Sequence, residues 1–310
     1  MELERDTQHC DLCGGGPLST VDVRRTLRYV VCRACGHCAQ ALSSAAQREA
    51  FSEAQSRCYN SGESDAQVHF PEALEGETLN CRIRMLRKWL APAAHVLEIG
   101  PGSGRLMQWM FEQGFKVSGV EESQNLRDLL PAALRSLVTV GEFESAPLPL
   151  NTMDAVCSFH VIEHVPDPMA HLARALALTK PNGLGFIATP NARSWHQRLL
   201  GSHSIHFSAA HLRVFSAKSL ATLCHAAGWE VVAVTTPAHS NAWFRTAAKG
   251  LRLLKGEDQD ATAGRYGFQP SRRMRVAIQV ARFLSLPVRW IQSLCGGGNE
   301  IVIVLRHPTK

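Results

Sequence analysis

The chain has 310 residues, of which 45% are hydrophobic and 19% are charged, and its formal net charge is +6. These proportions are those of a globular protein of one or two domains, and no apolar run approaches the roughly 18 residues that a membrane-spanning helix needs. The opening residues, MELERDTQHC, lack the basic start and the apolar stretch of a secretory signal. We therefore expect a cytoplasmic protein.

The net positive charge comes from the last quarter of the chain. Residues 241–310 contain 12 basic and 4 acidic side chains, a net charge of +8, whereas residues 1–240 contain 21 basic and 23 acidic ones, a net charge of −2. A protein that binds nucleic acid over its whole surface carries basic residues throughout. The distribution argues against that class and directs attention to the C-terminal segment.

Four of the ten cysteines form two C-x2-C pairs separated by 18 residues: Cys10, Cys13, Cys32 and Cys35. This spacing is typical of a four-cysteine zinc ribbon, and residues 19–31 between the pairs favour a short hairpin. Residues 1–42 hold too few apolar side chains to fold alone, so we expect structural zinc to supply the folding energy. A redox pair is the alternative, and Cys38 is a spare thiol that is an alternative ligand to Cys35.

Residues 43–94 are predicted to form a helical linker that ends in a lead-in helix, because leucine and isoleucine recur at helical spacing over residues 79–90. A short apolar strand over residues 95–99 follows. It runs into a glycine loop and then a helix, and glycines at such a turn let the backbone approach a ligand near free N–H groups. The glycines are Gly100, Gly102 and Gly104.

A second strand over residues 116–120 ends at Glu121, which lies 17 residues beyond Gly104. An acidic residue at about this spacing holds the ribose hydroxyls of a bound nucleotide. The glycine loop and this carboxylate together predict a site for a cofactor that contains a nucleoside.

The order of elements predicts an α/β fold with a doubly wound, mostly parallel sheet, since strands and helices alternate. We place the core at residues 95–240, a basic helical insertion at 241–298 and a final strand at 299–310. The expected elements are strands over 95–99, 116–120, 137–140, 153–158, 183–189, 229–235 and 299–305, and helices over 104–113, 124–134, 168–178 and 216–227.

Six stretches, taken in order, resemble the class I S-adenosylmethionine-dependent methyltransferases over residues 79–234. They are VLEIGPGSGRL (96–106), VEES (120–123), GEFESAPLP (141–149), DAVCSFHVIEHVPDP (154–168), LTKPNGLGFIATPN (178–191) and HLRVFSAKSLATLCHAAGWEV (211–231). The resemblance implies a seven-stranded Rossmann-like sheet whose last strand is antiparallel. It also implies that the glycine loop wraps the methionine part of S-adenosylmethionine, that Glu121 binds its ribose, and that Glu142 and Phe143 flank its adenine. Glu98 and His160 complete the expected cofactor contacts.

The chemistry is expected after the fourth strand of the core, because ligands gather beyond the carboxyl ends of parallel strands. His160, Glu163 and His164 stand there in the run HVIEH. Methyl transfer to a hydroxyl needs a base, and His164 is the preferred candidate because imidazole titrates near neutral pH. His211 is a second candidate, from a later histidine group that also includes His196, His203 and His206.

A divalent cation is an alternative to a histidine base. Ubiquinone-type O-methyltransferases and small-RNA 3′-end 2′-O-methyltransferases carry Glu-x-x-Glu-His at this place and bind a cation with it. The chain matches Glu163 and His164 but has His160 in place of the first glutamate. A hard ion such as magnesium suits that set poorly.

The basic segments 241–257 and 271–294 mix apolar and cationic residues at helical spacing. One apolar side is formed by Val276, Val280, Phe283, Leu284 and Val288, with a bend expected at Pro287. Two interpretations are compatible: a helical cap over the acceptor pocket, and a face for an acidic membrane surface or an anionic substrate. The second places the protein peripherally at the inner face of the membrane.

The zinc ribbon in front of this core resembles that of sugar and secondary-metabolite methyltransferases. We therefore expect a small-molecule or glycan acceptor, phosphate-bearing or lipid-linked, with oxygen favoured over carbon or nitrogen as the methylated atom. The alternative is an RNA methyltransferase whose ribbon binds nucleic acid. Residues 1–40 hold five basic and five acidic side chains and a single aromatic residue, Tyr29, which argues against it. The sequence indicates no particular oligomeric state.

Overall fold

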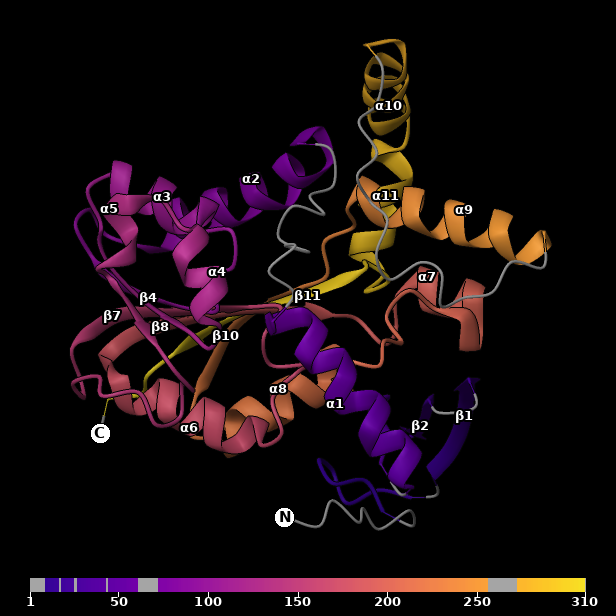
Figure 1. Ribbon diagram of the computed structural model, residues 1–310, viewed down its shortest axis with the longest axis horizontal. Coiled ribbons are helices and arrows are strands. Elements are labelled where there is room, and N and C mark those ends of the chain that lie inside the picture. The colour runs from indigo at the N-terminus through magenta and orange to yellow at the C-terminus, as the bar shows by residue number, and fades with distance from the viewer. Residues whose placement is uncertain are drawn as a thin grey trace.

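A seven-stranded sheet lies at the centre of the computed structural model, which describes residues 9–16, 18–24, 27–42, 44–60, 72–255 and 272–309 (Figure 1). The strand order is β10-β11-β8-β7-β4-β5-β6; the pairs from β8 to β6 are parallel, and β11 is antiparallel to both neighbours. The predicted doubly wound fold with an antiparallel last strand is thus confirmed. The strands are β4 (His95–Ile99), β5 (Lys116–Glu121), β6 (Val138–Val140), β7 (Met153–Phe159), β8 (Thr179–Pro190), β10 (Glu230–Thr235) and β11 (Glu300–Arg306).

The sheet is buried on both faces, which explains why its strands are almost continuously apolar. Alternate residues of one strand point to opposite sides: Leu97 joins the apolar cluster under α6 and α8, and Val96 joins the cluster under α2 and α3. Helices therefore cover both faces (Figure 1). They are α2 (Glu72–Trp89), α3 (Arg105–Glu112), α4 (Gln124–Leu129), α5 (Ala132–Arg135), α6 (Pro168–Leu178) and α8 (Ala217–Ala226).

The helix expected over residues 124–134 is two helices, α4 and α5. Leu130 is extended, with φ −64° and ψ 152°, and Pro131 follows it. A residue before proline is pushed out of the helical region because the proline ring clashes with its backbone. The expectation of one continuous helix was wrong at this proline.

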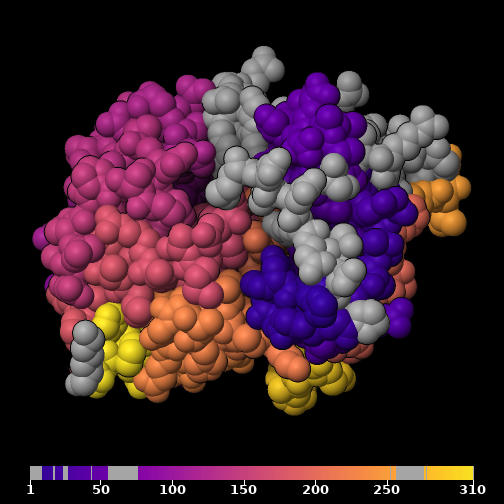
Figure 2. Space-filling model, turned by 90° about the horizontal axis from the view of Figure 1, so that it is seen from below, coloured from indigo at the N-terminus to yellow at the C-terminus, as the bar shows by residue number. Residues whose placement is uncertain are grey.

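The N-terminal ribbon forms a second sheet from β1 (Leu18–Arg24), β2 (Leu27–Cys32) and β3 (Cys38–Ala41), and a strand of the core completes it. β9 (Arg213–Val214) pairs with β3. The Ser216 hydroxyl donates to the carbonyl oxygen of Cys35, and Arg213 pairs with Asp11 at 3.5 Å. The ribbon is seated directly on the core (Figure 2), so it is part of the same packed body and not a free appendage.

The insertion before β11 consists of α9 (Ser240–Leu254), α10 (Arg272–Leu284) and α11 (Leu286–Leu294). It projects beyond the sheet (Figure 1). The chain breaks between α10 and α11 at Ser285, and Pro287 occupies the first turn of α11, where its missing N–H has no cost. The helix is thus divided two residues before Pro287, and the bend expected at Pro287 itself stays a prediction. No helix within the described ranges is long and apolar enough to cross a membrane.

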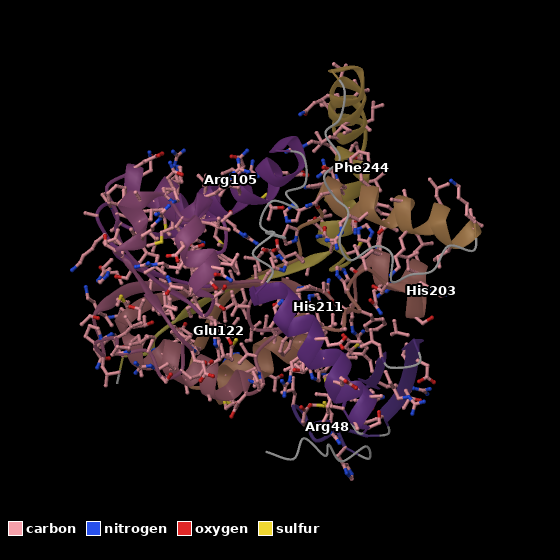
Figure 3. The ribbon with its side chains drawn as sticks, in the orientation of Figure 1. Arg48, Arg105, Glu122, His203, His211 and Phe244 are labelled. Carbon is pink, nitrogen blue, oxygen red and sulfur yellow. The ribbon has the colours of Figure 1, made fainter. Side chains whose placement is uncertain are left out.

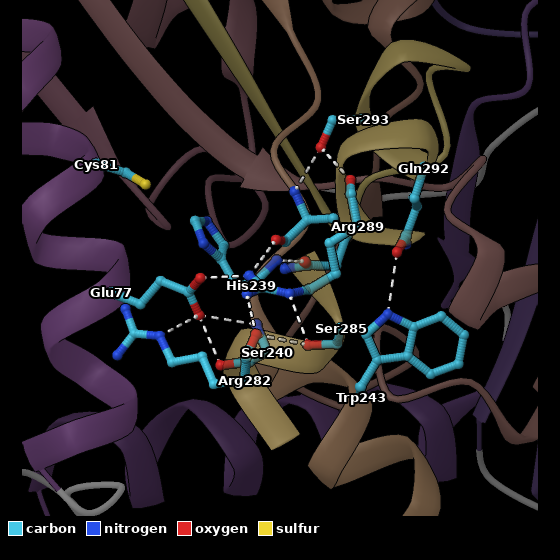
Figure 4. Close-up of polar contacts among 12 residues, drawn as sticks. Glu77, Cys81, His239, Ser240, Trp243, Arg282, Ser285, Arg289, Gln292 and Ser293 are labelled. Atoms are coloured by element: carbon cyan, nitrogen blue, oxygen red, sulfur yellow. Dashed lines mark hydrogen bonds and ion pairs between the residues drawn. The ribbon is translucent and has the colours of Figure 1, made fainter. Parts of the chain in front are cut away.

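A buried ion pair ties the insertion to α2 (Figure 4). Arg289 of α11, 4% exposed, pairs with Glu77 of α2, and Glu77 also accepts hydrogen bonds from the backbone N–H and the hydroxyl of Ser240 at 2.9 and 2.6 Å. Burial acts to raise the pKa of Glu77, but the hydrogen bonds from Ser240 and Arg289 outweigh it and lower the pKa. The carboxylate therefore stays charged and joins three helices.

We expect Arg289→Met to destabilise the fold by about 3 kcal/mol, because it leaves the buried carboxylate of Glu77 with only the cation Arg282, whose Nε lies 3.8 Å away. Urea denaturation measures this change in the free energy of unfolding. Lys116→Met, on the exposed side of β5, is the matched control and should change little. Equal stability of the two variants would show that the ion pair does not hold the insertion in place.

Candidate active site

A cavity of about 960 Å³ opens at the carboxyl ends of β4, β5 and β7, where the topology of the sheet places ligands. Its lining comes from five parts of the chain. These are Phe51 of α1 (Ala45–Asn60), the glycine loop, residues 120–126, residues 141–144, and a segment after β7 that includes His160 and His164. Glu122, on this lining, is marked in Figure 3.

The glycine loop is shaped by positive φ angles and by close packing. Gly100 has φ +64°, and a Cβ there would lie 2.9 Å from Cγ2 of Val161; Gly104 has φ +70°, and its Cβ would lie 2.5 Å from Cδ2 of Leu130. Side chains are therefore excluded at both positions. At Gly102 a Cβ would meet open space within the cavity, so the backbone there is accessible to a ligand.

Glu121 ends β5 with its carboxylate in the cavity. Its oxygens accept hydrogen bonds from the backbone N–H of Ser123 at 3.1 Å and of Gly102 at 3.3 Å, and burial raises its pKa. Phe143 is buried beside it on the lining, and Glu142 is exposed at the rim.

Two of the expected cofactor residues lie away from the lining. Gly104 caps α3 behind the loop. Glu98 is buried in β4, and burial raises its pKa to about 8. Their expected contacts with the cofactor remain predictions.

His160 is held between two carboxylates at the end of β7. Its Nδ1 donates to Oε1 of Glu163 at 3.1 Å and its Nε2 donates to Oε1 of Glu300 at 2.7 Å. Burial alone would lower the pKa of His160, but these two hydrogen bonds raise it to about 9. Because both ring nitrogens donate, His160 is a cation at neutral pH and has no lone pair with which to act as a base.

Glu300 is a site residue that the sequence did not reveal. It begins β11, is 2% exposed, and accepts from Nε2 of His239 at 2.9 Å and from Arg82 at 3.3 Å as well as from His160. An antiparallel strand starts at the edge where its parallel neighbours end, which is how Glu300 reaches the site. The one signal in the sequence is an acidic residue directly before the apolar run IVIVL.

His164 and His211 form a second pair, with ring centroids 4.9 Å apart. Each donates Nδ1–H to a carbonyl oxygen, His164 to Ala210 and His211 to His206, both at 2.8 Å. This fixes the tautomer, so each Nε2 has a lone pair for a proton or a metal ion. His164 lines the cavity and His211 lies behind it, where burial lowers the pKa of His211 to about 4.

Glu163 completes this group, with its side chain wholly buried. Its Oε2 accepts from the hydroxyl of Thr189 at 2.9 Å; burial would raise its pKa, but His160 lowers it to about 2. One oxygen of Glu163 and one nitrogen from each of His164 and His211 lie within 4.8 Å of one another. The sequence suggested the first two as cation ligands, and the fold adds His211.

A family of methyltransferase domains matches residues 75–234, just over half of the chain. The chain belongs to this family. Similar curated proteins are ubiquinone biosynthesis O-methyltransferases, among them those of Xanthomonas campestris (28% identity over 53% of this chain and 66% of that protein) and Histophilus somni (33% identity over 36% and 51%). The chain thus spans about half to two thirds of the relatives it matches.

Solved structures with a similar fold include a SAM-dependent methyltransferase from Archaeoglobus fulgidus, with a TM-score of 0.49, 16% identity, and coverage of 76% of this chain and 96% of that one. A putative methyltransferase from Bacillus halodurans has a TM-score of 0.48, 14% identity, and coverage of 76% and 100%.

The cysteine quartet of this methyltransferase-family chain is assembled in the ribbon. The four sulfurs lie within 4.8 Å of one another, and the Cys10–Cys35 and Cys13–Cys32 sulfur pairs are each 3.7 Å apart. A tetrahedron with zinc–sulfur bonds of about 2.3 Å has edges of about 3.8 Å, whereas a disulfide requires about 2.05 Å. The four thiols therefore fit a metal ion and are not disulfide-bonded. Cys38 is buried in β3, outside this group.

The remaining histidines of the predicted group lie away from the cavity lining. His196 of α7 (Trp195–Leu200) is fully buried; its Nδ1 is 2.9 Å from the hydroxyl of Thr246, and burial lowers its pKa to about 4. His206 is buried as well, and burial lowers its pKa. His203 lies on the α7 side of the molecule, away from Glu122 (Figure 3).

The neutral His196 makes stability depend on pH. Its folded-state pKa of about 4 is below the unfolded value of about 6.5, so protonation favours the unfolded chain as pH falls through this window. Between about pH 7.5 and 5 this one group should cost about 2 kcal/mol. We expect His196→Gln to lose correspondingly less stability than the wild type in chemical denaturation at the two pH values. Exposed His225→Gln is the control, and parallel pH profiles for all three proteins would contradict the prediction.

Proposed function

We propose that the protein is an S-adenosylmethionine-dependent O-methyltransferase acting on a small molecule. The observation that carries this proposal is one cavity whose lining includes both the glycine loop with Glu121 and His164, whose Nε2 has no hydrogen-bond partner among the described residues. Membership of the methyltransferase family and the similarity to ubiquinone biosynthesis O-methyltransferases support it. Since the chain spans only part of those relatives, their substrates are not transferred to it.

The lining fits S-adenosylmethionine, which supplies an electrophilic methyl group on its sulfonium when bound. Glu121 would accept hydrogen bonds from the ribose hydroxyls, in place of its present bond to the Gly102 N–H. Phe143 and Glu142 would flank the adenine. Gly100 and Gly102 let the backbone approach the methionine part.

His164 would take the proton from the acceptor hydroxyl, because its tautomer is fixed and its Nε2 has no hydrogen-bond partner in the part of the chain that the structure describes. His211 and Glu163 are positioning residues in this mechanism. His160 would supply a fixed positive charge at the same wall. The second candidate is cation-assisted catalysis, which the grouping of Glu163, His164 and His211 favours. Two nitrogens and one oxygen suit zinc, iron or manganese better than magnesium.

Two substitutions separate cofactor binding from chemistry. Glu121→Gln should weaken binding of S-adenosylhomocysteine about tenfold in calorimetry, since it weakens charged hydrogen bonds to the ribose. His164→Gln should bind it normally but lose about 100-fold in methyl transfer to a panel of catechols and hydroxylated aromatic acids. Exposed Glu112→Gln and His225→Gln are the matched controls.

Absence of any S-adenosylhomocysteine binding to the wild type would refute the enzyme proposal. Assays with a chelator choose between the two mechanisms. Activity that survives the chelator supports a histidine base, whereas activity that is lost and then restored by one divalent ion supports the cation.

We also propose that the four ribbon cysteines hold structural zinc, on the strength of the sulfur spacing. Protein purified without chelator should contain about one equivalent of zinc, and Cys32→Ser/Cys35→Ser should contain none. Exposed Cys295→Ser should keep the metal. Less than about half an equivalent in the wild type, or equal contents in all three, would contradict the proposal.

The acceptor that we favour is lipid-linked, with the insertion resting on an acidic membrane surface; a glycan or another phosphate-bearing acceptor is the alternative. Among the described side chains between residues 276 and 294, nine large apolar ones are exposed, including Phe283 at 71% and Trp290 at 65%. Residues 241–310 carry a net +8 (12 basic and 4 acidic side chains). Apolar exposure beside cationic charge favours binding to anionic lipids.

Neither relative described above is named as an RNA methyltransferase, so the RNA alternative gains no support.

Vesicle sedimentation tests this surface. The protein should bind phosphatidylglycerol vesicles better than phosphatidylcholine vesicles, and Phe283→Ser/Trp290→Ser should reduce binding about tenfold because buried apolar area is lost. Phe111→Ser, which removes an exposed aromatic side chain from α3, should bind like the wild type. Equal binding to both lipids, or no binding, would contradict the membrane proposal.

A further inference from the structure

A second cavity, which we call the seam cavity, lies where the ribbon meets the core. Its volume is about 390 Å³, within the range of small-molecule sites. The ribbon contributes residues of β2, β3 and the second cysteine knuckle, and the core contributes residues 192–207. Its apolar wall consists of Val21, Val31, Ala192 and Phe207, and these side chains belong to the apolar cluster that joins ribbon and core.

Among the described residues, three arginines line the seam cavity, Arg33, Arg193 and Arg198, and no aspartate or glutamate does. Within the described part of the chain, none of the three guanidinium groups has a hydrogen bond or an ion pair with a carboxylate. Among the described residues, no carboxylate thus balances their charge, since the ribbon residues Asp11 and Asp22 pair with other arginines.

The cavity also presents polar groups that are available to a ligand. Gly36 has φ +76°, and a Cβ there would lie 2.6 Å from Nε of Arg193, so the glycine makes room for this guanidinium group. The partly buried Ser202 also lines the cavity. A ligand that presents an anion to the arginines, with a polar group for this hydroxyl, would suit the lining.

We propose that the seam cavity binds a small molecule bearing a phosphate or diphosphate group. The guanidinium group of arginine binds two phosphate oxygens at once, and three such groups can balance more than one negative charge on the ligand. The apolar wall would hold the body of the ligand. This inference does not rest on the methyltransferase proposal, because binding here requires neither cofactor nor methyl transfer.

The seam cavity nevertheless adjoins the candidate active site. Phe207 stacks on Tyr29 with ring centroids 4.5 Å apart, and the Tyr29 hydroxyl donates to the carbonyl oxygens of Ser208 and His211 at 2.8 and 2.7 Å. His211 in turn packs against His164 of the larger cavity. A chain of contacts through Phe207, Tyr29 and His211 therefore connects the two cavities.

Calorimetry with inorganic pyrophosphate and glucose 6-phosphate, each in saturating S-adenosylhomocysteine, tests the proposal, with glucose as the uncharged control. The wild type should bind both anions. Arg33→Gln/Arg193→Gln/Arg198→Gln should bind them about tenfold more weakly or worse, because charged hydrogen bonds are lost. Arg84→Gln/Lys88→Gln/Lys116→Gln, which removes the same charge from an exposed face, should bind within about twofold of the wild type.

No anion binding by the wild type, or equal losses in the two triple variants, would overturn the proposal; the first result would mean that the arginines only neutralise the nearby thiolates. Binding of a single-stranded RNA that pyrophosphate does not displace would overturn it in favour of a nucleic-acid surface. Arg198→Gln alone, on the exposed side of α7, keeps the test valid if the triple variant does not fold. Failure of S-adenosylhomocysteine to bind would count against the proposed function alone.

Discussion

Two buried carboxylates hold one imidazole at the reactive edge of the sheet, and the rest of the site depends on this arrangement. Glu163 and Glu300 each accept a hydrogen bond from His160, which leaves β7 with φ +57°. A left-handed conformation is costly for a residue with a side chain, and the charged hydrogen bonds offset that cost. These two hydrogen bonds of His160 fix where β7 ends and therefore where His164 enters the cavity.

Glu300 also connects the site to distant parts of the chain. Glu300 also binds His239, which precedes α9, and Arg82 of α2. Together with the Glu77–Arg289 pair, these contacts orient the insertion through buried polar groups. Its apolar side chains are therefore left on the outside, and the described lining of the cavity contains none of them.

The ribbon contributes to the site through its position. Because β9 completes its sheet and the Tyr29 hydroxyl contacts the carbonyl oxygens of Ser208 and His211, the ribbon packs against the segment that carries His211. The geometry of the four cysteines holds the second knuckle, with Arg33 and Gly36, beside the core. A structural module of this kind can shape a binding surface without taking part in the chemistry.

Local signals were sufficient for much of this protein. The alternation of apolar strands and helices predicted the doubly wound sheet, the glycine loop and Glu121 predicted one shared cavity, and the cysteine spacing predicted the quartet, since each pattern lies within a short stretch of sequence. Only the tertiary structure decided that His160 is held as a cation between two carboxylates and that Glu300 and Phe51 belong to the site. It also decided that β9 completes the sheet of the ribbon. His160 and Glu300 are 140 residues apart, and no local pattern encodes such a contact. Helical periodicity likewise identifies an apolar side of α10 but not what that side faces, because that is set by polar contacts made elsewhere in the chain.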